Sequence, residues 1–253
     1  FSSTSTEKNC QLYTQLTSVM KLLAEDIKRR GLAGSLAFPP GFLDARAFQW
    51  LGFDTTFNYT FVAQLPLNDS NLDTSVRKNS RKAEKEGCSV KRSHNWEEVI
   101  YCINKTAQTK GFDYLFNADQ LTRCSEILGD NILFAHIGYS DELLPISAQV
   151  KISMPDGICI DWLAGTDRSF INSGINQYLY SHALNEISIA CSKYFDYCGA
   201  NIESVARAKA AWGFDLVPYI TIVDHSLTGK AKKAFGHVRG ARKFWHFIRR
   251  NFT

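Results

Sequence analysis

A lysine near the C-terminal end of the chain stands at the border of a face that its helix should bury. Val205, Ala208 and Trp212 recur at the spacing of an apolar helical stripe in "ESVARAKAAWG", residues 203–213. Lys209 lies beside this stripe, so the stem of its side chain must run along apolar surface. The ammonium group then either extends to solvent or brings a positive charge into the interior. Inside a protein, such a charge can stabilise an oxygen atom that becomes negative during a reaction.

A polar loop that leads into a long helix is the second stretch suited to chemistry. In "DWLAGTDRSFINSGINQYL", a strand ends near Gly165 and a helix begins after Gly174. The first turn of a helix carries unpaired N–H groups and the positive end of the helix dipole, which suit a phosphate or a developing oxyanion. We therefore expect Gly174 and Asn176 to hold the activated part of a donor molecule. The simpler interpretation is an ordinary turn between a strand and a helix.

The sequence lacks the motifs of the common hydrolases, zinc sites and phosphate-binding loops. It contains no G-x-S-x-G, no H-E-x-x-H and no P-loop, and its six histidines show no paired ligand spacing. We therefore expect no metal and no covalently bound cofactor. The seven cysteines form no C-x-x-C pair, and their odd number argues against a disulfide framework. Free thiols, a polar N-terminal stretch and the lack of an apolar run of ~18 residues predict a cytoplasmic protein.

Positive charge is concentrated at two places. The net charge is +4, yet residues 226–253 hold eight Lys or Arg and no acidic residue, so the first 225 residues hold 21 basic and 25 acidic groups. The aromatic side chains in this basic tail suit either an anionic membrane surface with a lipid-linked substrate, or packing back onto the domain. Residues 74–87 form a second basic stretch, in which Arg77 and Arg81 either face solvent or bind the phosphates of a substrate.

Periodicity predicts alternating groups of helices and strands. A first helix over residues 11–30 should turn one apolar face inward, made of Leu12, Leu16, Val19, Leu23 and Ile27. Further helices are expected at 74–87, 95–110, 118–128 and 174–192, and strands at 58–67, 131–139, 144–154 and 157–165. Residues 195–219 should form a strand, a helix from about Ile202 to Trp212 capped by Asn201 and ended by Gly213, and a second strand. This order predicts an α+β domain with helices layered on a sheet.

Five stretches resemble, in their order and spacing, the Fem-like branch of the GNAT (Gcn5-related N-acetyltransferase) superfamily. They are "DARAFQWLGF", "NYTFVAQLPL", "VRKNSRKAEKEG", "DWLAGTD" and "FDYCGANIESVARAKAAWGFDLVPY", and the resemblance runs from about residue 15 to residue 224. The basic helix and the closing D-x-x-G-A … K-x-x-x-G pattern are the most specific of them. This branch includes the FemAB-like peptidoglycan aminoacyltransferases. The resemblance therefore implies an α+β, GNAT-like fold.

The resemblance also implies a division into lobes. Residues 1–66 would form part of a first GNAT-like lobe, whose front half is expected before Phe1, and residues 93–224 would form a complete second, catalytic lobe. Residues 67–92 would be a basic connecting helix, and residues 225–253 a basic aromatic tail. The coiled-coil arm of some aminoacyl-tRNA-dependent members and the Q/R-x-x-G-x-G/A motif of GNAT enzymes are both missing. The implied donor therefore stays open between acyl-CoA and an aminoacyl-tRNA.

An activity and the role of Lys209 follow from the same resemblance, and the other site residues are predicted from their polar or basic side chains and their places in the chain. Members transfer an acyl or aminoacyl group, here expected to reach an amine of a cell-envelope precursor or a small metabolite. The lysine before the F-G-like turn lies near the reacting centre in this family, and Lys209 before Trp212-Gly213 matches it. The predicted catalytic residues are Lys209, Asp196 and Tyr219, and the predicted substrate-binding residues are Asp161, Trp162, Arg207, Arg77 and Arg81. Asp161, Asp196 and Tyr219 all remain open as the group that takes a proton from the acceptor.

A function from another class also fits the sequence. Because the glycine-rich donor motif is missing, the chain could be a catalytically inactive GNAT-like scaffold that binds nucleic acid or another anionic partner through its basic surface. Turnover of acyl-CoA or aminoacyl-tRNA with formation of an amide product would separate the two hypotheses. We favour the transferase.

Overall fold

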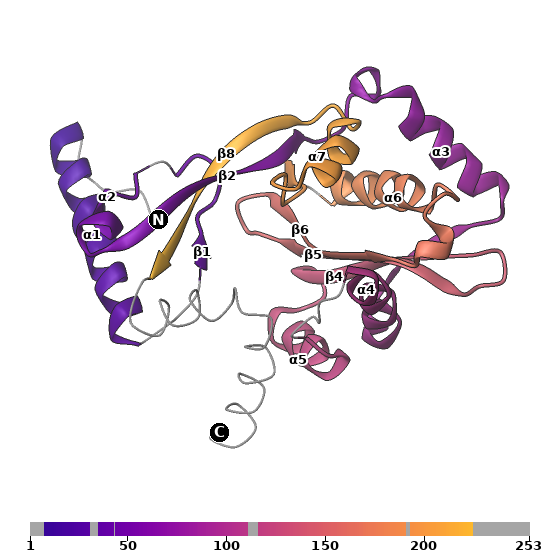
Figure 1. The fold of residues 1–253 in the computed structure, drawn as a ribbon, viewed down its shortest axis with the longest axis horizontal. Helices are drawn as coiled ribbons and strands as arrows, with labels where there is room; N and C mark the ends of the chain where they lie inside the picture. Colours follow the sequence, from indigo (N-terminus) through magenta and orange to yellow (C-terminus); the bar gives the residue numbers. More distant parts are fainter. Residues whose placement is uncertain (1–7, 31–34, 43, 111–115, 191–192, 225–253) are drawn as a thin grey trace. The chain divides into compact units, whose positions relative to one another are not determined.

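A computed structural model describes residues 8–30, 35–42, 44–110, 116–190 and 193–224 (Figure 1). The chain divides into two compact units. Unit 1 combines residues 1–58 with residues 218–253, and unit 2 is residues 59–217. Strands β2 (Phe53–Gln64) and β8 (Asp215–Asp224) each have residues in both units, and the predicted lobe boundaries at residues 66, 92 and 224 stay predictions.

The described residues of unit 1 form two helices and three strands. Helix α1 (Asn9–Arg29) packs on the short helix α2 (Arg46–Trp50), and strand β1 (Ser35–Ala37) pairs antiparallel with β8 in the order β1-β8-β2. Its core contains Met20, Ala24, Ala45, Ala47, Phe48, Phe53, Ile220 and Ile222.

The buried face of α1 differs from the predicted one. Met20 and Ala24 are the buried residues of the helix, whereas Leu16 and Val19 are exposed. The small side chain of Ala24 lets α1 approach the aromatic ring of Phe48, so the packed face is turned away from the larger aliphatic residues. Leu23 and Ile27 lie at its border and are partly buried.

Unit 2 contains a mixed sheet in the order β2-β7-β6-β5-β4-β3. Its further strands are β3 (Ser89–Ser93), β4 (Leu133–Tyr139), β5 (Pro145–Ser153), β6 (Ile158–Thr166) and β7 (Tyr194–Asp196). Its helices are α3 (Thr74–Lys85), α4 (Trp96–Lys110), α5 (Ala118–Leu128), α6 (Ile175–Ile189) and α7 (Glu203–Ala210), with 3-10 turns at Asp69–Asn71 and Arg168–Phe170. All strand pairs are antiparallel except β6 with β7, which is parallel.

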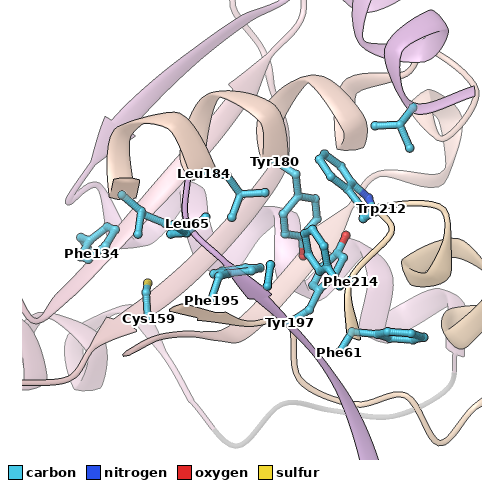
Figure 2. Close-up of a cluster of buried hydrophobic side chains, with 13 residues drawn as sticks. Phe61, Leu65, Phe134, Cys159, Tyr180, Leu184, Phe195, Tyr197, Trp212 and Phe214 are labelled. Carbon is cyan, nitrogen blue, oxygen red and sulfur yellow. The ribbon is translucent and has the colours of Figure 1, made fainter. Parts of the chain in front are cut away.

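Helices cover both faces of this sheet (Figure 1). On one face, Val99 and Ile103 of α4 and Leu121 of α5 pack against β4, β5 and β6. On the other face, α6 packs through Tyr180 and Leu184 on a cluster shown in Figure 2. Because successive strand residues point to opposite faces, both faces of β5 must be filled by buried side chains.

The longer elements agree with the sequence prediction. The predicted helices at 74–87, 95–110, 118–128 and 174–192 and the four predicted strands are all present with boundaries shifted by a few residues. Strands β1 and β3 and helix α2 were not predicted. Each has at most five residues, too few to show a periodic pattern. No helix in the described part of the chain is both long and apolar enough to cross a membrane.

The cysteines of the described segments are free thiols, as predicted: Cys10, Cys88, Cys102, Cys124, Cys159 and Cys198. Cys191 and the basic tail after Asp224 lie outside the described residues. The predictions for them stay predictions.

Gly165 marks a close approach of α4 to the sheet. A Cβ atom at this position would lie 2.4 Å from Cα of Ile103 and 2.6 Å from the carbonyl oxygen of Cys102. Those contacts are with helix backbone, which cannot move away as the end of a flexible side chain can. Thr106 adds to the contact, because its hydroxyl accepts a hydrogen bond from Thr166 N at 2.8 Å.

We expect Gly165→Ala to destabilise the protein by about 1–3 kcal/mol, because the added methyl group forces α4 away from β6. Chemical denaturation followed by circular dichroism measures this change. Ala164→Ser, at the exposed neighbouring position, is the matched control and should leave the free energy of unfolding nearly unchanged. Equal stabilities of the two variants would show that α4 does not pack this closely.

Candidate active site

The parallel strands β6 and β7 separate in the middle of the sheet of unit 2. They pair from Ile158 with Tyr194 to Ile160 with Asp196, and the pairing ends there. Strand β6 continues along β5 as far as Thr166. The chain after β7 instead follows β2, since Tyr197 N donates to Phe61 O at 2.8 Å and Ala200 N to Tyr59 O at 2.9 Å. The two backbones therefore diverge, and side chains fill the interior beyond the last pair.

A buried ion pair lies at this divergence. The ammonium of Lys151 is 3.0 Å from Oδ1 of Asp161, and both residues are almost fully enclosed, with relative exposures of 0% and 5%. Lys151 also donates to Oε1 of Gln149 at 2.7 Å. The hydroxyl of Tyr180, on α6, donates to the other oxygen of Asp161 at 2.5 Å. Each charge thus has partners of opposite character, which burial in an apolar interior requires.

Aromatic rings lie close to the ion pair, and Figure 2 shows four of them: Tyr180, Phe195, Tyr197 and Trp212. The ring centroids of Tyr180 and Tyr197 are 4.6 Å apart, and Trp212 lies 5.7 Å from Tyr180. The Lys151 ammonium lies 5.1 Å from the centroid of Tyr180 and 5.5 Å from that of Phe195. Burial raises the pKa of the Tyr180 hydroxyl, and the nearby Asp161 carboxylate raises it further. Tyr180 therefore stays a hydrogen-bond donor at neutral pH.

Lys209 approaches the same cluster from α7. Its ammonium donates hydrogen bonds to the carbonyl oxygens of Tyr197 and Cys198, directly after β7, and lies 4.3 Å from the ring centroid of Tyr197. Burial lowers its pKa, while Asp161, Cys198 and Asp196 act in the opposite direction. An ammonium has three N–H groups. Among the described residues, two of them have protein acceptors, the carbonyl oxygens of Tyr197 and Cys198.

The inward face of α7 is rotated from the predicted one. Ala208 is exposed, and Val205, Ala206 and Lys209 are the partly buried residues of the helix. Lys209 therefore points inward with the apolar side chains instead of lying beside them. The rotation follows from Trp212, which is 3% exposed and lies after the helix proper, beyond the C-cap at Ala211.

The predicted N-cap of α7 is also wrong. Asn201 does not cap the helix, because its Oδ1 accepts a hydrogen bond from Tyr59 N on β2 at 2.8 Å, and Ile202 occupies the cap position. Gly213, in contrast, ends this region as predicted. It has φ 69° and lies so close to Asn71 that a Cβ atom would be 2.2 Å from the Asn71 carbonyl oxygen.

Asp196 is held at the end of β7. Its Oδ1 accepts hydrogen bonds from the hydroxyl of Thr60 at 2.5 Å and from Cys198 N at 2.9 Å. Cys198 has φ 46°, a left-handed conformation that the second bond helps to hold. Because both donors reach Oδ1, a proton from a substrate would go to Oδ2. The catalytic role of Asp196 stays a prediction.

The start of α6 is packed against α3. Gly174 is left-handed, with φ 86°, and a Cβ atom there would lie 2.1 Å from the carbonyl oxygen of Asn79. The Oδ1 atom of Asn176 accepts hydrogen bonds from the hydroxyls of Thr166 at 2.6 Å and Ser147 at 3.2 Å. These contacts give Gly174 and Asn176 structural roles, and their predicted contact with a donor stays a prediction.

The other predicted binding residues lie at separate places. Trp162 is partly buried on the opposite face of the sheet, where its ring meets Phe116 at 5.1 Å. Arg207 is exposed and paired with Glu203, and Arg77 and Arg81 lie on the exposed face of α3. Tyr219 belongs to β8 within unit 1. The structure thus brings together Lys209, Asp161 and Asp196, and it adds Lys151, Tyr180 and Tyr197.

Only part of this cluster could be recognised in the sequence. Lys151 and Gln149 sit in "PISAQVKIS", where alternation suggests polar residues that face solvent. Because α6 covers that face, both are buried instead, with exposures of 0% and 1%. One signal for this burial was present in the sequence. Helices are predicted both before and after a short run of strands, so helices were available to cover both faces of the sheet. In the described residues, no three His, Cys, Asp or Glu side chains are grouped so that they could hold a metal ion.

A cavity of about 310 Å³ lies elsewhere in unit 2. Residues 62–68 of β2 and the turn after it form one wall, and residues 212–215 form another. Its polar side chains are Gln64, Asn68, Asn71 and Asp215. Lys209, Asp161 and Asp196 do not line it, whereas Trp212, one of the aromatic rings near the ion pair, does.

Several solved structures align with most of this chain. FemX aligns with a TM-score of 0.60 at 11% identity, over 81% of this chain and 76% of FemX. L-PGS from Bacillus licheniformis gives 0.60 at 11% identity, over 84% and 74%. A domain assigned as the C-terminal part of a lysylphosphatidylglycerol synthetase from Agrobacterium fabrum gives 0.60 at 10% identity, over 83% and 74%. The chain has a Fem-like GNAT-type fold.

This fold was predicted from the five sequence stretches, and it is confirmed. Sequence comparison alone finds less: no family model matches the chain, and no curated protein matches it. At these sequence identities, the similarity to the solved structures is a similarity of fold.

A second buried polar group lies on the same face of the sheet as Lys151. His136 of β4 is 1% exposed, and its Nε2 is 3.0 Å from Oε2 of Glu186 on α6. Arg92 donates to the other oxygen of Glu186 at 2.8 Å. Burial lowers the pKa of His136, and the charge of Lys151 lowers it further, although Glu186 acts in the opposite direction. His136 is therefore neutral in the folded protein at neutral pH.

We expect the protein to lose stability as the pH falls below about 6.5, the ordinary pKa of histidine. The unfolded chain takes up a proton on His136 in that range and the folded protein does not, so acid favours unfolding. His136→Gln should flatten this slope when denaturation is measured between pH 4 and pH 8. His182→Gln, at an exposed position on α6, should retain the wild-type slope. An unchanged slope in His136→Gln would contradict the neutral, buried state.

Proposed function

We propose that the protein is an N-acyltransferase. It would move an acyl or aminoacyl group from an activated donor, acyl-CoA or an aminoacyl-tRNA, to an amine of a cell-envelope precursor or a small metabolite. The observation that carries this proposal is the Lys209 ammonium, which is fixed on two carbonyl oxygens where β6 and β7 diverge. The GNAT-type fold and its likeness to FemX support it.

The reaction requires charge stabilisation at an oxygen atom. When the acceptor amine attacks the ester or thioester carbonyl, a C–N bond forms and the carbonyl oxygen becomes negative. The remaining N–H of Lys209 would donate to this oxygen from a partly buried position, where the interaction is stronger than in water. As the intermediate collapses, the C–O or C–S bond breaks, and the leaving group takes a proton from the attacking nitrogen. No enzyme-bound acyl intermediate is needed.

The acceptor ammonium has to lose a proton before it attacks. Of the predicted groups, Asp161 already accepts hydrogen bonds from Lys151 and Tyr180, so it is poorly placed to take another proton. Asp196 keeps its Oδ2 atom for this role, as argued above. We therefore favour Asp196 over Asp161, with Tyr219 as a further predicted participant.

Each of the two donor hypotheses corresponds to one surface of unit 2. The N-terminus of α6 would receive a pyrophosphate in the acyl-CoA hypothesis, and there Lys82 of α3 donates to the carbonyl of Asn172 at 2.7 Å. The exposed basic residues of α3, Arg77, Lys78, Arg81 and Lys85, would contact phosphates in the aminoacyl-tRNA hypothesis. Contact with an anionic membrane or a lipid-linked acceptor, and a cytoplasmic location, complete the proposal.

We expect Lys209→Met to reduce turnover by about two orders of magnitude, because the variant keeps the bulk of the side chain and removes the charge that stabilises the oxyanion. The assay offers the protein a panel of acyl-CoA and aminoacyl-tRNA donors with amine acceptors and detects amide products by mass spectrometry. Thermal unfolding checks that the variant folds.

Lys91→Met is the matched control, since Lys91 is an exposed lysine on β3, and it should keep wild-type turnover. If the Lys209→Met variant turns over at the wild-type rate, the ammonium of Lys209 has no role in the reaction. If full-length protein forms no amide product with any donor, the transferase proposal fails.

A further inference from the structure

We propose that Lys151 is a positioning residue, which acts through Asp161 to set the charge state of Lys209. This inference rests on the proposed function for its consequence in catalysis, and on the geometry of unit 2 for its mechanism. Lys151 itself has an exposure of 0% and is enclosed by Gln149, Asp161 and aromatic rings. It therefore cannot reach a substrate.

A continuous series of contacts joins the two lysines. Lys151 Nζ lies 3.0 Å from Asp161 Oδ1, and Tyr180 donates to Asp161 Oδ2 at 2.5 Å. The ring of Tyr180 is 4.6 Å from the ring of Tyr197. Lys209 lies over that second ring, at 4.3 Å, and donates to the carbonyl oxygen of the same residue. Two packed aromatic side chains therefore connect Asp161 with Lys209 by contact, and Asp161 also acts on Lys209 through space.

The charges that face Lys209 come from three strands. Asp161 lies on β6, Asp196 lies on β7 with Cys198 just after it, and Lys151 lies on β5. Burial lowers the pKa of Lys209, Asp161 is the strongest of the groups that raise it, and Lys151 lowers it by charge repulsion. Because Lys151 is bound to Asp161, the carboxylate does not act on Lys209 as a free negative charge.

This arrangement has a reason in the proposed chemistry. A lysine paired directly with a carboxylate would have its positive field cancelled at close range. Here Asp161 is paired with Lys151, and the direct partners of Lys209 are neutral carbonyl oxygens. The field of the Lys209 ammonium is thus left for a developing oxyanion, and Lys151 is the residue that keeps Asp161 engaged.

The double variant Lys151→Met, Asp161→Asn tests the inference. It removes both charges and leaves neutral side chains of similar size, so the core should remain folded, which thermal unfolding checks. Competitive labelling with trace acetic anhydride over a range of pH, read by peptide mass spectrometry, gives the titration midpoint of Lys209. Lys78, exposed on α3, serves as the internal reference. We expect the Lys209 midpoint to move to lower pH, because the attraction of Asp161 outweighs the repulsion of Lys151.

Tyr180→Phe is the second variant, and it is needed if the double variant does not fold. It keeps the ion pair and removes one hydrogen bond from Asp161, so that more of the carboxylate charge acts on Lys209. The Lys209 midpoint should then move to higher pH. A Lys209 midpoint that stays at the wild-type value in a folded variant, double or single, overturns the inference.

Labelling and turnover separate this inference from the proposed function. Labelling requires no substrate, so the coupling of Lys151 to Lys209 is tested even if no donor reacts. The pH dependence of kcat in the double variant should move in the same direction as the labelling midpoint, with a smaller effect on KM. If labelling moves and the kcat profile does not, the charge coupling stands and Lys209 loses its role in the reaction.

Discussion

The parallel pairing of β6 with β7 lasts for three residue pairs, and the interior of unit 2 is arranged around its end. Parallel neighbours need a crossover, which α6 provides on one face of the sheet. After Ile160 and Asp196 each chain keeps hydrogen bonds with a different partner, β5 for one and β2 for the other. Side chains must fill the space between them, and the polar ones among them need partners inside the protein.

Their partners place the two lysines of the cluster, Lys151 and Lys209, in different chemical environments. Lys151 has a carboxylate and an amide oxygen as direct partners, so its charge is compensated at close range. Lys209 has carbonyl dipoles and an aromatic ring as its surroundings, and these bind a cation without cancelling its charge. The two residues are of one type, yet one completes the core and the other presents a positive charge.

The sequence predicted the long elements well because their ends are marked locally. Helix α3 begins after the cap Asp73, and α5 begins at the capping box of Asn117 and Gln120. The short strands β1 and β3 are stabilised by pairing with residues far along the chain, which local pattern does not show. The predictions of the buried face of α1 and of a buried Ala208 were wrong for a related reason. The packing partner, and not the spacing of apolar residues, decides which side of each helix is buried.

The same limit applies to the prediction of the site residues: local patterns were recognised in the sequence, and long-range contacts were not. Lys209 and Asp196 were found because a linear motif contains both, whereas Lys151, Tyr180 and Tyr197 acquire their roles from strand register and from α6. The partner of Lys151 lies ten residues away on another strand, at a register pair that a bulge in β6 displaces. No spacing rule predicts such a pair, because a shift of one residue would place Lys151 on the other face.

The division of the chain into units sets the order in which the protein can be completed during synthesis. Residues 59–217 form unit 2 without interruption, but unit 1 needs residues from both ends. Strand β1 pairs with β8, and the core of unit 1 contains Ile220 and Ile222 next to Phe48 and Phe53. Because synthesis runs from the N-terminus, residues 59–217 are made before β8, and Phe48 and Phe53 lack Ile220 and Ile222 as core partners until β8 is made.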